Sequence, residues 1–227
     1  NVIDLGVRLF SAKNSEKNLE RRTNRGGRRL IRRKTNRLKD AKKILAAVGF
    51  YEDKSLKNSC PYQLRVKGLT EPLSKGEIYK VTLHILKKRG ISYLDEDDTE
   101  AAKESQDYKE QVRKNAQLLT KYTPGQIQLQ RLKENNRVKT GINAQGNYQL
   151  NVFKVSAYAN ELATILKTQQ AFYPNELTDD WIALFVQPGI AEEAGLIYRK
   201  RPYYHGPGNE ANNSPYGRWS DFKKTGQ

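Results

Sequence analysis

The chain has few of the residues that build disulfide-stabilised, metal-binding or redox proteins. It contains one cysteine, Cys60, and two histidines. A single cysteine excludes an internal disulfide framework, which fits a reducing cytoplasm. Cys and His never occur at zinc-site spacing, and neither glycine-rich phosphate-binding motif is found. These absences argue against a disulfide scaffold, a zinc protein and a nucleotide-binding enzyme.

Long apolar runs and methionine are also missing. The longest apolar run, residues 181–186, has six residues. A membrane-spanning helix needs about 20. The first residues do not have the charged and then apolar layout of a secretion signal, so we expect no membrane association. Because the chain starts with Asn1 and contains no methionine, we expect it to be a piece of a longer protein.

Acidic side chains are nearly absent from one stretch. Residues 21–43 hold 12 lysines and arginines and one acid, Asp40. This stretch supplies +11 of the net charge of +16, and the other residues supply +5, from 29 basic and 24 acidic side chains. The basic character is therefore local. A local basic patch points to a polyanion as partner.

The apolar pattern predicts one long helix in this region. Residues 15–48 form a single helical stretch, with Ser15 as N-cap and Gly49 as the stop. Its second half carries apolar residues spaced three and four apart: Leu38, Ala41, Leu45 and Val48. Its first half has almost no apolar residues, so we expect only the second half to pack on a core.

Further helices are predicted along the rest of the chain. Residues 74–90 begin with Ser74 and Glu77 at capping-box spacing and end at Gly90. Residues 104–121 have a predicted apolar face made of Tyr108, Val112, Ala116 and Leu119. Three more helices are expected to follow the caps Thr123, Ser156 and Thr178.

Little β-structure is expected. Residues 1–10 are apolar enough for a strand, and a lone strand needs a sheet to join. Within residues 137–153, Gly146 and Asn147 suggest a small hairpin. From Gly206 onward, Gly, Asn, Ser and Pro predict a loop. The predicted fold class is mainly α, with one hairpin and one long basic helix.

The basic helix is unfavourable by itself. Pairs such as Arg21/Arg25, Arg25/Arg29 and Arg29/Arg33 place like charges four residues apart. Each pair costs about 0.2–0.5 kcal/mol, and Gly26 and Gly27 cost roughly 1 kcal/mol each relative to alanine. Phosphates would supply the missing countercharge, and released counterions would add entropy.

The arginines also spread over more than half of the helix circumference. A helix lying on a membrane needs an apolar side, which this half does not have. Arginine is preferred over lysine, which suits bidentate phosphate contacts. We therefore favour nucleic-acid binding over a solvated basic helix or a localisation signal.

No set of residues predicts catalysis. Asp4 stands alone, and one carboxylate cannot hold two metals. The consecutive acids of "DEDDTE" at 95–100 point in different directions, so a solvated loop is the better interpretation. His84 is expected to be partly buried on a helix, and His205 has no acid or nucleophile nearby. We expect no catalytic residue, no metal site and no cofactor.

Two further basic segments leave alternatives open. In "YRKRPYYHGPGN", cations adjoin Tyr203 and Tyr204, which suits phosphate contact with base stacking or a tyrosine pair that anchors a loop. In "KKRG" at 87–90, three cations end a helix, where the helix dipole alone would favour them.

Together these motifs resemble a known family. "RRTNRGGRRLIRRK" is similar to the bridge helix of the type II CRISPR RNA-guided DNA endonucleases, the Cas9 family, and the resemblance is greatest to small II-A members. Six further motifs follow in the order of that family's recognition lobe: "PYQLRVKGL" (61–69), "HILKKRGISYL" (84–94), "TPGQIQLQR" (123–131), "SAYANE" (156–161), "ILKTQQAFYP" (165–174) and "YYHGPGNE" (203–210).

The resemblance implies a division of the chain and a set of RNA contacts. Residues 1–12 would be a remnant strand of the RuvC-like nuclease domain, 13–49 the bridge helix and 50–227 part of the recognition lobe. Guide-RNA phosphates of the seed would be held by arginines of the bridge helix: Arg22, Arg25, Arg28, Arg29, Arg32, Arg33 and Arg37. Arg89 and Gly90 match a guide-contacting turn, and Tyr203 matches a residue near the guide–target heteroduplex.

The resemblance also implies partners and absences. The partners would be guide RNA (crRNA with tracrRNA, or a single guide) and the target DNA strand, with a protein inhibitor as a further candidate. Asp4 in "IDLG" lies too close to the bridge helix to be the family's catalytic aspartate. We therefore expect an RNA-binding fragment that does not cut DNA and lacks the Mg sites of the full-length family. The alternatives are a stand-alone, ribosome-associated RNA-binding protein and a metal enzyme that uses Asp4 and the acidic loop.

Overall fold

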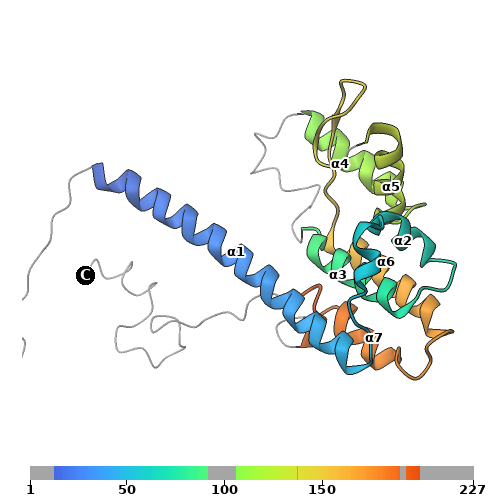
Figure 1. Cartoon of the computed structure of the whole chain (residues 1–227). Coiled ribbons are helices and arrows are strands. Elements are labelled where there is room, and N and C mark those ends of the chain that lie inside the picture. The colour runs from blue at the N-terminus through green and yellow to red at the C-terminus, as the bar shows by residue number, and fades with distance from the viewer. Residues whose placement is uncertain (1–12, 92–105, 137, 190–192, 200–227) are drawn as a thin grey trace, which may run out of the picture.

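The structure, a computed structural model, describes residues 13–91, 106–136, 138–189 and 193–199 (Figure 1). Its elements are α1 (Lys13–Ala47), the 3-10 helix η1 (Lys54–Asn58), α2 (Pro61–Lys67), α3 (Lys75–Lys88), α4 (Gln106–Leu119), α5 (Pro124–Asn135), β1 (Gly141–Ile142), β2 (Tyr148–Gln149), α6 (Val155–Gln170) and α7 (Asp179–Val186). The predicted mainly α-helical fold with one small hairpin is confirmed.

Helix α1 runs out from the body of shorter helices (Figure 1). Only its C-terminal part joins the core, where Ala41 and Leu45 are fully buried and α1 packs on α3. The chain then turns at Gly49, whose N–H bonds to the carbonyl of Ala46 at 3.1 Å. The long helix, its inward stripe and its stop are as predicted.

The predicted start of α1 is wrong by a few residues. The helix begins at Lys13, so Ser15 lies within it and is not its N-cap. Serine costs a helix only roughly 0.5 kcal/mol relative to alanine, so a serine in the first turn does not force the helix to begin there.

The body has two parts joined by α2. Helices α3, α6 and α7 form one part, which surrounds an aromatic cluster of Phe50, Trp181 and Phe185. Helices α4 and α5 and the hairpin form the other part (Figure 1). Helix α2 packs on both α3 and α5, and α6 packs on α3, α5 and α7. The two parts therefore share one hydrophobic core, and α1 packs on α3.

Three of the predicted caps are present. Ser74 and Glu77 form a reciprocal capping box on α3, and Thr123 does the same with Gln126 on α5. The Thr178 hydroxyl accepts a bond from the N–H of Trp181. The Ser156 cap is wrong, because α6 begins at Val155, and its cap residue makes no side-chain bond. The buried side chain of Val155 fixes this start by packing in the core.

The hairpin forms where predicted but pairs only two residues on each side. Gly141 is opposite Gln149, and Ile142 is opposite Tyr148. The turn is held by Asn143, whose side-chain oxygen accepts bonds from the N–H groups of Gln145 and Asn147 at 3.1 and 2.8 Å.

Sequence patterns missed two short elements and one buried position. Helix α2 and η1 were not predicted, since neither is long enough to show a period. On α4 the inward position is Asn115, which is 3% exposed, while Ala116 is exposed. The predicted strand at 1–10, the acidic loop at 95–100 and the loop after Gly206 lie outside the described residues.

Candidate nucleic-acid interface

The N-terminal two-thirds of α1 present a row of exposed guanidinium groups. These belong to Arg22, Arg25, Arg28, Arg29, Arg32 and Arg33. Among the described residues, no carboxylate forms an ion pair with any of them. With a rise of 1.5 Å per residue, the row from Arg22 to Arg33 extends about 17 Å. The helix thus displays cations over several turns, and no carboxylate in the described part of the chain neutralises them.

At the base of this row, Arg37 is partly built into the protein. Its Nε donates to the carbonyl of Leu86 at 3.1 Å, near the end of α3. Burial and then the charge of Arg89 lower the pKa of Arg37 to about 10. Arg37 remains protonated at neutral pH. It therefore both ties α1 to α3 and brings positive charge to their junction.

Arg89 meets this junction from the other side. Its Nη1 donates to the carbonyls of Ile197 and Arg199 at 3.1 and 3.2 Å. Burial, and then the nearby charge of Arg33, lowers the pKa of Arg89. Arg89 thus lies close enough to Arg37 to lower its pKa, and Arg33 lies close enough to Arg89 to lower that of Arg89. An anion placed beside these guanidinium groups would offset their repulsion.

Gly90 has a structural reason to be glycine. Its φ of +78° is a left-handed conformation, and a Cβ there would collide with the backbone of Phe153 and Lys154. The next residue, Ile91, pairs with the same segment through its N–H and the carbonyl of Phe153 at 3.1 Å. The turn that carries Arg89 is therefore fixed against the start of α6.

Of the other predicted contact residues, the structure describes some and not others. Lys87 and Lys88 are exposed at the C-terminal end of α3, as expected from "KKRG". Tyr203, Tyr204 and His205 lie outside the described residues, as does Asp4. The structure therefore brings together the base of α1 and the end of α3, and it does not place the tyrosine segment.

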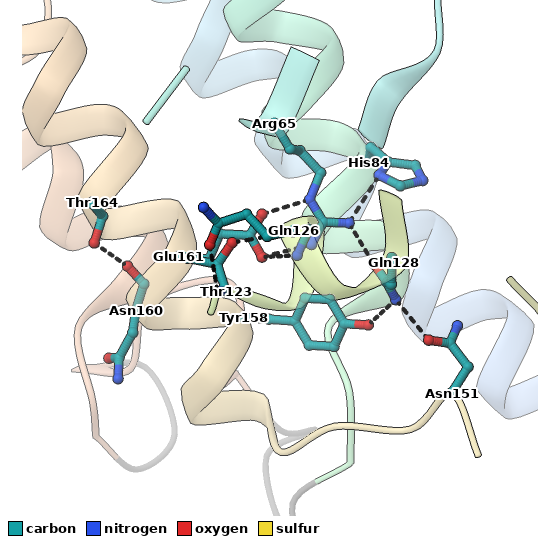
Figure 2. Close-up of polar contacts among 11 residues, drawn as sticks. Arg65, His84, Thr123, Gln126, Gln128, Asn151, Tyr158, Asn160, Glu161 and Thr164 are labelled. Atoms are coloured by element: carbon teal, nitrogen blue, oxygen red, sulfur yellow. Dashed lines mark hydrogen bonds and ion pairs between the residues drawn. The ribbon is translucent and has the colours of Figure 1, made fainter. Parts of the chain in front are cut away.

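A buried polar network that the sequence did not reveal joins α2, α5 and α6 (Figure 2). Arg65, fully buried on α2, donates from Nε and Nη2 to the two carboxylate oxygens of Glu161 at 2.7 and 2.6 Å. Its Nη1 donates to Gln128 at 2.8 Å, and the N–H of Gly125 donates to Glu161 at 3.0 Å. A Cβ on Gly125 would collide with the Glu161 carboxylate, so α5 and α6 approach closely only with glycine there.

His84 borders this network. Its Nδ1 lies 3.5 Å from Nη1 of Arg65, and its ring stands edge-on to Tyr62. Burial, followed by the charges of Arg65 and Lys88, lowers the pKa of His84 to about 3. The imidazole is neutral at physiological pH, in agreement with the expected partly buried histidine.

The described part of the chain offers no metal centre. It contains no group of three or more His, Cys, Asp or Glu side chains that could hold an ion. Within the same residues, no helix combines the length and apolar character needed to cross a membrane.

Comparison with known proteins gives a consistent family. The chain is 39% identical over 230 residues to "CRISPR-associated endonuclease Cas9 1" of Streptococcus thermophilus, covering 99% of this chain and 20% of the relative. It is 36% identical to the Cas9 of Staphylococcus aureus, covering 98% of this chain and 19% of that protein. The chain thus spans about a fifth of the length of these curated relatives. No protein-family model matches it.

Solved structures agree. A cryo-EM structure of St1Cas9 with sgRNA and target DNA matches at a TM-score of 0.69 and 40% identity, covering 90% of this chain and 23% of that one. A crystal structure of Campylobacter jejuni Cas9 with sgRNA and target DNA has a TM-score of 0.55 at 22% identity, which shows the shared fold. None of these relatives is a stand-alone, ribosome-associated protein. The chain belongs to the type II CRISPR-associated Cas9 family.

Proposed function

We propose that this chain is the guide-RNA-binding part of a bacterial, cytoplasmic RNA-guided DNA endonuclease. Helix α1 would be its bridge helix, residues 50–227 part of its recognition lobe, and residues 1–12 a strand of its nuclease domain. The observation that carries the proposal is the row of exposed α1 arginines, which pair with no carboxylate among the described residues.

The exposed arginines would bind seed phosphates of the guide. Arg37 and Arg89 would act at the junction of α1 and α3, where neighbouring cations and partial burial favour a bound anion. Each has one nitrogen engaged with a backbone carbonyl, which fixes the direction of the guanidinium plane. Phosphate contacts of this kind position RNA and read little sequence.

The partners follow from the relatives. St1Cas9 structures contain sgRNA, target DNA and the protein AcrIIA6. We propose guide RNA and the target strand of the heteroduplex as partners of this chain, and a protein inhibitor as a third. We propose further that the chain by itself does not cleave DNA and holds no Mg, because the catalytic carboxylates of an endonuclease would lie elsewhere in a longer protein.

The test is RNA binding as a function of salt. Fluorescence anisotropy would compare the guide RNA of the Streptococcus thermophilus relative with an unrelated duplex of equal length. If 6–10 phosphates are bound, affinity should fall by about 10³–10⁵ between 50 and 200 mM salt. Binding that ignores salt would contradict phosphate contact.

A matched pair of variants locates the RNA-binding surface. Replacing Arg28, Arg29, Arg32 and Arg33 with alanine should reduce the slope of log affinity against log salt by about 4, or about 1 for each phosphate that the variant no longer binds. The control removes the same charge from exposed sites elsewhere: Lys109, Arg113, Lys121 and Lys133. An equal reduction in both variants would mean that only net charge matters, and the bridge-helix assignment would be wrong.

A further inference from the structure

A hollow of about 650 Å³ opens at the C-terminal end of α3, where Lys88 lines it. Its walls come from α2, α3, the segment between α5 and β1, and the residues after β2: Tyr62, Lys88, Asn136, Val138, Lys139, Thr140 and Asn151. This volume is within the range of small-ligand sites, about 300–1,000 Å³. The described lining residues include two lysines and no carboxylate, so the hollow favours an anionic ligand.

The aromatic wall is held in place from within the protein. The ring of Tyr62 stands perpendicular to His84 with centroids 5.0 Å apart, and the guanidinium of Arg65 lies 5.6 Å from its centroid. Arg65 is itself fixed by its two bonds to Glu161. A ring that is already ordered loses little freedom when a planar group stacks on it.

The polar wall is equally ordered. The N–H of Asn151 donates to the Thr140 hydroxyl at 3.0 Å. The side-chain oxygen of Asn151 accepts a bond from Gln128 at 3.3 Å. Asn136 ends α5 in a left-handed conformation with φ of +49°. Side-chain amides offer donors and acceptors that match the edges of nucleobases.

The hollow is linked to the basic junction through the end of α3. Lys88 lines it, and the next residue, Arg89, lies near Arg33. The end of α3 thus places one cation, Lys88, at the hollow and the next one, Arg89, at the junction with α1. Lys139 stands on the opposite segment of the wall and is exposed.

We propose that this hollow binds one unpaired ribonucleotide of the RNA held by α1, an inference that rests on the proposed function. The base stacks on Tyr62, its edge meets the amides of Asn136 and Asn151, and the flanking phosphate lies between Lys88 and Lys139. Base stacking combined with lysine contacts is the usual physics of unpaired RNA recognition.

The test uses two RNA probes that differ by one nucleotide. One is a fully paired duplex, and the other carries a single bulged nucleotide whose base is a fluorescent adenine analogue. The full chain should bind the bulged RNA about 10-fold more tightly, as expected for one base–aromatic stack, and should quench the analogue. Tyr62→Phe should retain both effects, and Tyr62→Leu should lose both while circular dichroism shows the helices intact.

Lys139→Ala provides a second measurement that does not disturb the packed ring. It should reduce the salt slope for the bulged RNA by about 1 and leave the slope for the paired RNA unchanged. Lys133→Ala, an exposed control on α5, should change neither. If the chain binds both RNAs equally and α1 variants still weaken both, the hollow is not a nucleotide site, and the proposed function stands. If it binds neither RNA, the proposed function and this inference both fail.

Discussion

Arginine side chains have opposite environments in the two regions of this molecule, the core of the body and the exposed part of α1. Inside the body, Arg65 is fully buried and meets both oxygens of Glu161 as well as Gln128. On α1, Arg28 and Arg29 are exposed, and no described carboxylate pairs with them. The arginine side chain is thus paired with a carboxylate inside the core, whereas on α1 it is exposed and can bind an external anion. Under the proposed function, the phosphates of a bound RNA would supply the countercharge that no described carboxylate supplies to these arginines.

The largest effect is expected where the buried pair is broken. Glu161→Gln leaves the Arg65 guanidinium buried without its countercharge, so the free energy of unfolding should fall by about 3–5 kcal/mol. Urea denaturation followed by circular dichroism measures this. Glu176→Gln, which removes a carboxylate paired with Lys75 at the surface, is the control and should change stability little. Similar destabilisation in the two variants would erase the contrast between buried and surface charge.

A second effect is the pH dependence of stability that comes from His84. The pKa of folded His84 is about 3, against 6.5 for an ordinary histidine. As pH falls from 6.5 toward 3, only the unfolded chain takes up this proton, so stability is lost by about 1.4 kcal/mol per pH unit in that window. His84→Gln should flatten this part of the pH profile. An NMR titration that gave His84 a pKa near 6.5 would contradict its burial.

The smallest effect concerns the exposed half of α1. Gly26 and Gly27 have open space where a Cβ would stand, with no described atom within 4 Å. Replacing both with alanine should stabilise the helix by about 1 kcal/mol per residue, seen as slower amide exchange. If an RNA backbone packs closely on these glycines, the same variant should bind guide RNA more weakly. Unchanged affinity would show that the glycines are not needed for close approach.

The sequence predicted those parts of the fold that depend on local chemistry. Ser74 with Glu77, and Thr123 with Gln126, satisfy free N–H groups within one turn, so their caps could be recognised from spacing alone. Ser156 misled because buried Val155 set the start of α6 through tertiary packing. Asn115 was missed because a polar residue faces inward only when partners such as Arg131 and the carbonyl of Leu150 are nearby.

The candidate nucleic-acid interface was only partly predictable from the sequence. The density of arginines on α1 pointed to a polyanion, since like charges at helical spacing require a counterion. The contact between Arg37 and Leu86, and the convergence of Arg33 with Arg89, join residues about 50 positions apart, and no local pattern encodes them. The hollow beside Lys88 depends in the same way on four separate segments that only the fold brings together.

Helix α1 has 35 residues and is therefore about 52 Å long, yet only its last turns are seated in the body. Because α1 is held by the described residues only at its C-terminal end, a small tilt there would move its N-terminal end over a large distance. The hydrogen bond from Arg37 to the carbonyl of Leu86 lies where α1 leaves the body. A force applied to the exposed N-terminal part of α1 would therefore act as a torque on the end of α3, through the bond between Arg37 and Leu86.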